Sequence, residues 1–152
     1  MLRKRTQSRE CALQILYQYE MNPEPMPEIL GKFWSQQDET FAEDVRGFAG
    51  KLAAGTVEHL PEIDKVVERY ADNWEISRMA MIDRNIMRLA TYELLYLADV
   101  PPKVTLNEAV NLAKKFSQEE SGKFVNGVLD KISHTEKPKT PKTPKDHDPS
   151  AG

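Results

Sequence analysis

The residues that most often do chemistry in proteins are few and scattered in this sequence. Its histidines are His59, His134 and His147, and its one cysteine is Cys11. None of them stands at the short spacing typical of paired metal ligands. The pair Gly122-Lys123 lacks the upstream glycine and the following Ser or Thr of a phosphate-binding loop. We therefore expect no metal site, no bound cofactor and no phosphate-binding loop.

Paired carboxylates are the remaining route to catalysis. The acids that could pair are Asp83, Glu93, Asp99 and Glu108. Glu93 stands among apolar positions of a helical pattern, where a buried carboxylate with hydrogen-bond partners is the more common finding. The sequence therefore indicates a protein that is not an enzyme and that has no catalytic residue.

Cations and an aromatic side chain suit a different chemistry, the binding of nucleic acid. Residues 3–9 include Arg3, Lys4, Arg5 and Arg9 and no acid. Further along, Lys114 and Lys115 end one helical pattern, and Lys123 and Phe124 open the next. When single-stranded RNA binds, such cations take the phosphates while a base stacks on the ring. From the residues alone, an RNA-binding surface and a protein–protein interaction module that meets an acidic helix both remain open.

The overall charge limits how RNA could be held. The chain has 152 residues and a net charge of −3, so RNA must meet a local basic patch and not a basic protein. Cations at a helix start oppose the helix dipole, which is easier to explain if an anion binds there. The alternative is a solvated N-terminus. We expect a cytoplasmic protein without a membrane segment, because apolar runs are short and the N-terminus lacks an apolar signal region.

Helices must position these residues, because apolar side chains recur at helical spacing and no alternating strand pattern occurs. A capping box at 105–108 predicts a helix beginning at about Leu106, and a second box at 40–43 predicts another. The last helix buries Val125, Val128, Leu129 and Ile132, which places Phe124 at the edge of the apolar stripe. The fold class is all-α, with six or seven helices in a bundle.

Two segments stand outside this helical pattern. The polar run 117–122 is expected to connect the last two helices, and Gly122 within it to allow close approach of a phosphate. From residue 136 the chain is rich in Lys, Pro and Thr with no apolar face, so we expect a disordered tail over 136–152. Residues 1–135 then form the folded domain.

Several separated motifs resemble the NusB family of transcription antitermination factors. They appear in the family's order and cover roughly residues 3–132. They are RECALQ at 9–14 followed by Tyr17, RLATYEL at 88–94, DVP at 99–101, NEA at 107–109 and KFVNGVLDK at 123–131. The resemblance implies an all-helical fold in two small subdomains. It also implies binding of the boxA element of ribosomal RNA leaders together with NusE, a small-subunit ribosomal protein, within the RNA polymerase antitermination complex.

The resemblance assigns roles to particular residues. The RNA-facing positions it implies are Lys4, Arg5, Arg9, Glu120, Lys123 and Phe124, to which Lys114 is added from its place at the helix end. The NusE-facing positions are Tyr17 and Asp83. Tyr17 lies off the centre of the apolar face, where it is either a rim packer or a partner contact, and Asp83 follows Ile82, which we expect to be buried.

Some questions stay open at the level of sequence. A related domain opens the ribosomal-RNA cytosine methyltransferases, but the length of this chain leaves no room for their catalytic domain. The alternative to direct RNA recognition is a non-catalytic protein adaptor of the transcription machinery. The sequence also leaves open the preferred RNA sequence and whether the free protein forms a homodimer. For Phe124, burial and stacking beneath a base are the two interpretations, and we expect stacking.

Overall fold

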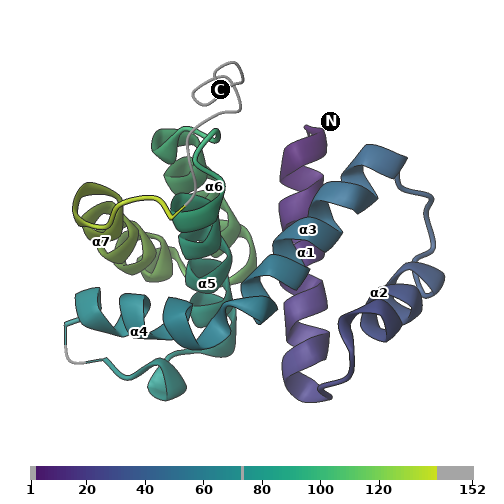
Figure 1. Cartoon of the computed structure of the whole chain (residues 1–152), viewed down its shortest axis with the longest axis horizontal. Helices are drawn as coiled ribbons and strands as arrows, with labels where there is room; N and C mark the ends of the chain where they lie inside the picture. The colour runs from purple at the N-terminus through teal and green to yellow at the C-terminus, as the bar shows by residue number, and fades with distance from the viewer. Residues whose placement is uncertain (1–2, 73, 140–152) are drawn as a thin grey trace. The chain divides into compact units, whose positions relative to one another are not determined.

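The computed structural model describes residues 3–72 and 74–139, and all the regular structure within these ranges is helical. Seven α-helices and one short 3-10 helix occur there, and no strand. They fall into two compact units that divide between His59 and Leu60. The prediction of an all-α fold with six or seven helices in two subdomains is confirmed (Figure 1).

The first unit contains three helices, α1 (Lys4–Met21), α2 (Met26–Ser35) and α3 (Glu43–Glu58). Helix α1 packs mainly against α3 (Figure 1). Ala12, Ile15 and Leu16 form its buried stripe at helical spacing. The Ser8 hydroxyl lies in the same interface and donates to the Val45 carbonyl oxygen at 2.8 Å. This bond satisfies a buried polar group and fixes the start of α1 on α3.

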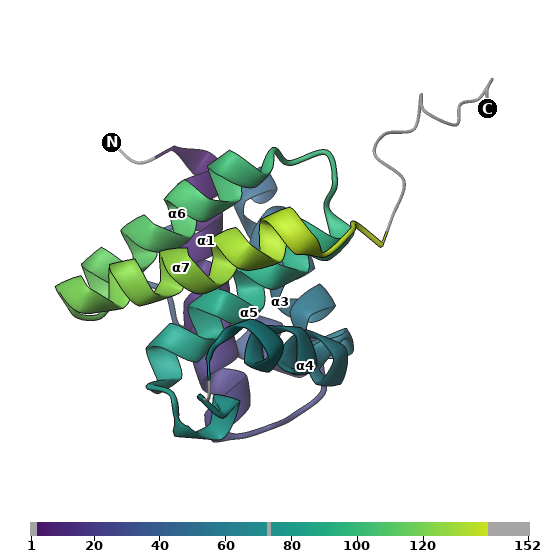
Figure 2. The same cartoon turned by 90° about the vertical axis from the view of Figure 1, so that its left-hand side faces the viewer.

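The second unit contains α4 (Leu60–Tyr70), the 3-10 helix η1 (Ile76–Arg78), α5 (Met81–Tyr96), α6 (Pro102–Phe116) and α7 (Glu119–Thr135). Helix α5 contacts α4, α6 and α7 and is buried over most of its length. Helices α6 and α7 lie side by side (Figure 2). The predicted core stripe of α7 is confirmed, because all four of its members are buried: Val125, Val128, Leu129 and Ile132.

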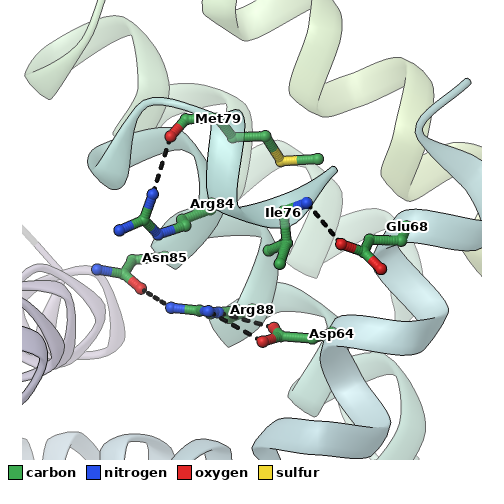
Figure 3. A network of polar contacts seen from close by, with 7 residues as sticks. All are labelled: Asp64, Glu68, Ile76, Met79, Arg84, Asn85 and Arg88. Carbon is green, nitrogen blue, oxygen red and sulfur yellow. Dashed lines mark hydrogen bonds and ion pairs between the residues drawn. The ribbon is translucent and has the colours of Figure 1, made fainter. Parts of the chain in front are cut away.

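A polar network joins α4 to α5 (Figure 3). The Arg88 guanidinium donates through Nε and Nη2 to the two carboxylate oxygens of Asp64, at 2.8 and 2.9 Å, and through Nη1 to Asn85 Oδ1 at 2.9 Å. Nearby, Arg84 donates to the Met79 carbonyl oxygen, and the Ile76 amide donates to Glu68. A bidentate Arg–carboxylate pair requires a specific geometry, so this network fixes the position of α4 against α5.

The predicted helix start at about Leu106 is wrong. Helix α6 begins four residues earlier, at Pro102, with Pro101 at the N-cap position and no side-chain cap. Proline fits the first helical turn because its fixed φ suits a helix and it lacks an N–H that would need a partner there. Thr105 is 1% exposed, and its hydroxyl donates to the buried Glu93 carboxylate at 2.9 Å. The threonine therefore satisfies Glu93 inside the unit, and Glu93 has the structural role expected of it.

The second predicted capping box is also wrong. Helix α3 begins at Glu43, after an N-cap at Ala42 that makes no side-chain bond. Phe41 precedes the helix and meets the Trp34 ring edge to face, at 5.6 Å between ring centroids. Glu43 and Asp44 occupy the first turn of α3, where acidic side chains favour the positive end of the helix dipole. The negative charges of Glu43 and Asp44 thus stabilise this helix start in place of the expected hydroxyl cap.

The predicted tail begins inside the second unit. Glu136 directly follows α7 and accepts hydrogen bonds from Arg69 and Tyr70, and the Tyr70 bond is the main cause that lowers the pKa of its carboxyl. Lys139 pairs with Glu62 at 3.0 Å, and its amide donates to the Leu95 carbonyl oxygen. Residues 136–139 are therefore held on this unit, while the rest of the predicted tail, 140–152, lies outside the described residues.

Candidate nucleic-acid interface

The N-terminal cations belong to the first turns of α1. Lys4 and Arg5 are exposed, and both already have a neighbour in the first unit. Lys4 Nζ lies 3.1 Å from an Asp44 carboxylate oxygen, and this hydrogen bond is the main cause that lowers the pKa of Asp44. The Arg5 guanidinium lies over the Phe48 ring, 3.7 Å from its centroid. A ring on one side of the guanidinium leaves its edge free to meet a phosphate.

Arg9 is buried, unlike Lys4 and Arg5. It follows Arg5 by one helical turn, and its guanidinium lies 5.7 Å from the same Phe48 ring. Only 4% of Arg9 is exposed, so its side chain is almost entirely withdrawn from solvent. A backbone phosphate approaching from solvent meets Lys4 and Arg5 before it meets Arg9.

The connector between α6 and α7 is shorter than predicted. Only Ser117 and Gln118 separate the two helices, and the remaining residues of the expected connector, 119–122, form the start of α7. Glu119 and Glu120 stand in its first turn, where their charge favours the helix dipole. The run 117–122 carries no apolar stripe, which is why its sequence predicts a connector and not a helix. In the structure Glu119 and Glu120 are exposed, and this turn is nonetheless helical.

Gly122 does not offer the open backbone that was expected for a phosphate. It is buried against α6, and a Cβ atom at this position would lie 3.5 Å from Cγ of Lys114. The aliphatic stem of Lys114 therefore passes over the start of α7. Lys114, Glu120 and Lys123 are all exposed. The structure thus places Lys114 beside the start of α7, which carries Glu120, Lys123 and Phe124.

Phe124 is half-buried, in agreement with its predicted place at the edge of the α7 stripe. Its ring meets the Trp74 indole edge to face, with 6.1 Å between centroids and 61° between planes. Trp74 itself is 52% exposed. Sequence reasoning missed this residue, because it follows α4 in a loop, where no helical periodicity indicates what a side chain meets. An apolar aromatic in an otherwise polar loop was the available signal.

Tyr17, a predicted partner contact, is 53% exposed on α1. It lines a hollow of about 580 Å³ on the first unit, together with the exposed Met21 and with Phe33 at the floor. The rest of the lining is made of amide side chains: Gln14, Gln18, Asn22, Gln36 and Gln37. No charged side chain lines this hollow, which suits a neutral or backbone contact with a partner.

Asp83, the other predicted partner contact, lies in the second unit and is half-buried. Its Oδ2 accepts a hydrogen bond from the Ser121 hydroxyl at 3.0 Å, which joins α5 to α7. Its Oδ1 is buried without a hydrogen-bond partner. The expectation that Ile82 is buried is wrong, because Ile82 is 36% exposed at the start of α5.

Side chains that could bind a metal do not cluster among the described residues. Across residues 3–72 and 74–139, no three or more His, Cys, Asp or Glu side chains gather as metal ligands would. Burial, reinforced by the carboxylates of Glu10 and Glu39, raises the pKa of the Cys11 thiol to about 11. The thiol is therefore protonated at neutral pH and a poor nucleophile. Among the helices in this part of the chain, none has the length and apolar character needed to cross a membrane.

The chain is similar in sequence and in structure to known proteins. The NusB family matches residues 6–134. A transcription antitermination protein NusB of Thermodesulfovibrio yellowstonii is 45% identical over 141 residues, which cover 88% of this chain and 93% of the relative. A solved structure of T. maritima NusB superposes with a TM-score of 0.80 at 38% identity, covering 91% of this chain and 96% of the other.

A second solved structure shows a relative with its ligands. It is described as the antitermination factors NusB and NusE in complex with dsRNA, and its matching chain has a TM-score of 0.78 at 32% identity. The match covers 88% of this chain and 98% of that one. The family match spans most of the described residues, and the relative and both solved structures match over most of this chain and of their own. The chain belongs to the NusB family of transcription antitermination proteins.

Proposed function

We propose that the protein is a cytoplasmic, non-catalytic antitermination factor that binds boxA-type single-stranded RNA of ribosomal RNA leaders together with NusE. In this role it joins the RNA polymerase antitermination complex and keeps transcription from ending early. The observation that carries the proposal is the half-buried Phe124 ring beside the exposed cation Lys123, at the start of a helix whose core stripe is otherwise buried.

The start of α7 has the chemistry of a single-stranded RNA site. An unstacked base can lie on the Phe124 ring while Lys123 and Lys114 meet the phosphates on either side. Glu120 is exposed in the first turn and can accept a hydrogen bond from a base amino group, which adds discrimination between bases. Lys4 and Arg5 of the first unit add phosphate contacts. Arg9 supports them from the interior by its place beside the Phe48 ring.

Tyr17 and Asp83 are the residues we assign to the NusE contact. Tyr17 offers an exposed ring at the rim of an uncharged hollow, and aromatic anchors of this kind carry much of the energy of protein interfaces. Asp83 offers a carboxylate beside the exposed Ile82. Tyr17 lies about three helical turns after Arg5 on α1, so the Tyr17 contact can be weakened without removing a cation that we assign to RNA. Asp83 lies beside the start of α7 through its bond to Ser121.

A gel-shift experiment with two RNAs and one partner tests the proposed function. A boxA-type RNA should be retarded by the protein more strongly than a scrambled RNA of the same composition, and NusE should strengthen the difference. If the protein binds NusE but shifts both RNAs equally weakly, the protein is an adaptor without RNA recognition of its own. That result would contradict the proposal.

Removal of the two exposed N-terminal cations should reduce the salt dependence of RNA binding. Each phosphate neutralised on a single strand contributes about −0.7 to the slope of log affinity against log salt. The double variant Lys4→Ala/Arg5→Ala should therefore flatten the slope by about one to one and a half units. The matched control is Lys51→Ala/Lys65→Ala, which removes the same charge from exposed positions outside the proposed surface. Equal slopes for the two variants would make the N-terminal cations a solvated helix end.

Truncation of Tyr17 should weaken the partner contact alone. Loss of an exposed aromatic anchor typically costs more than 1 kcal/mol, so Tyr17→Ala should weaken NusE binding about tenfold in calorimetry. RNA binding without NusE should stay at the parent level. Asp83→Asn is the companion variant, because it removes the charge but can still accept from Ser121. Unchanged NusE affinity in both variants would remove these residues from the partner face.

A further inference from the structure

The ring that meets Phe124 belongs to Trp74, and hydrogen bonds hold the backbone on both sides of this residue. Trp74 lies between α4 and η1, and its amide donates to the Ala71 carbonyl oxygen at 3.2 Å. Ala71 is buried, so this bond ties the loop to the core of the second unit. On the other side, Glu68 accepts from the Ile76 amide at 2.7 Å (Figure 3). The backbone that carries the indole is therefore fixed both at Trp74 and two residues after it.

The same loop is also tied to α7. Asp72 has a positive φ of 44°, and its carboxylate pairs with Lys131 of α7 at 3.0 Å. Aspartate tolerates this backbone conformation better than most residues. The indole then meets the Phe124 ring edge to face. Despite these contacts, 52% of Trp74 stays in solvent, which is unusual for the largest apolar side chain.

The two rings together form a corner and not a flat surface. With 61° between their planes, a base that stacks on one ring meets the other with its edge. On α7 the exposed cation next to Phe124 is Lys123, whereas Lys131 already pairs with Asp72. A phosphate that flanks a stacked base finds the Lys123 ammonium group nearby.

We propose that Trp74 is a second stacking residue for single-stranded RNA and that it forms one aromatic site with Phe124. The inference rests on the proposed function and extends it, because it places a residue from the α4–η1 loop in the RNA surface. The site takes an unstacked base that follows or precedes the one on Phe124. Trp74 adds affinity through stacking, which tolerates any base, while Glu120 supplies the discrimination between bases.

The indole itself provides the first test. The chain has two tryptophans, and Trp34 packs on Phe33 and Phe41 in the first unit. In a Trp34→Phe background, all tryptophan fluorescence comes from Trp74. Titration with a boxA-type RNA should quench this fluorescence in step with binding measured by anisotropy of a labelled RNA. Full binding with no change in the fluorescence would show that no base stacks on Trp74.

Affinity provides the second test. Trp74→Leu should weaken binding of the same RNA about tenfold, and Trp74→Phe should restore most of the loss because it keeps a ring. Helix content by circular dichroism should match the parent in both variants, since the indole is half in solvent. If the parent binds boxA-type RNA selectively and Trp74→Leu binds it equally well, the inference is wrong and the proposed function stands. If the parent itself shows no selective RNA binding, the proposed function fails.

Discussion

Asp64→Asn is expected to lower the free energy of unfolding by about 2–3 kcal/mol, because it removes the carboxylate charge that faces the buried Arg88 guanidinium. The Arg88 side chain is only 11% exposed and gives Asp64 two hydrogen bonds. Asparagine can accept one of these bonds but carries no charge. The expected cost lies below the roughly 3–5 kcal/mol of a fully buried broken pair, because 22% of the Asp64 side chain reaches solvent. Urea unfolding followed by circular dichroism measures it.

Asp72→Asn is the matched control within the same unit. Asp72 pairs with Lys131, but 81% of its side chain is exposed, so the pair is screened by water. Asparagine tolerates the positive φ at this position, which removes backbone strain as a cause. The control should cost less than about 0.5 kcal/mol. Equal losses for the two variants would show that the Arg88 network does not hold α4 on α5.

Phe124→Leu is expected to weaken binding of boxA-type RNA by about tenfold at constant NusE, since a stacked base is worth about 1–3 kcal/mol and leucine offers no flat ring. The change keeps most of the apolar volume at a half-buried site. Loss of stability should therefore stay below about 1.5 kcal/mol. Anisotropy of a labelled RNA gives the affinity, and thermal unfolding gives the stability.

Phe41→Leu separates an RNA contact from a general loss of aromatic packing. Phe41 is also half-buried and also meets a tryptophan, but it lies in the first unit beside Trp34. The control should change stability by a similar amount and leave RNA affinity at the parent level. Parent-like RNA affinity in the Phe124→Leu protein would make Phe124 a packing residue and move the RNA surface toward Lys4 and Arg5.

Periodicity predicted the parts of the fold that depend on which face of a helix is apolar. The stripe of α7 and the buried face of α1 are where the spacing put them, and Phe124 sits at the edge of its stripe as expected. These features follow from local geometry, since each side chain's direction is set by its own helix. The same geometry predicts that the charged side chains at the start of α7 face solvent, as they do.

Features that depend on contacts between helices could not be predicted in this way. The Thr105 motif matched a capping box, but a buried carboxylate on α5 needed its hydroxyl, and Pro102 offered an earlier helix start. Arg9 is one of the cations of residues 3–9 that the sequence predicts to bind RNA, but it is buried, with its guanidinium near the Phe48 ring. Trp74 was missed because a loop residue has no periodicity from which its neighbour can be inferred.

Photo-crosslinking is the measurement that tests the RNA surface most directly. A boxA-type RNA that carries 4-thiouridine would be bound to the protein with NusE, irradiated, and digested with trypsin. Cleavage after Lys123 and Lys131 releases residues 124–131 as one peptide. The account predicts crosslinked RNA on this peptide at Phe124, and none after competition with excess unlabelled boxA-type RNA. Crosslinks confined to the hollow around Tyr17, with the 124–131 peptide unmodified, would contradict it.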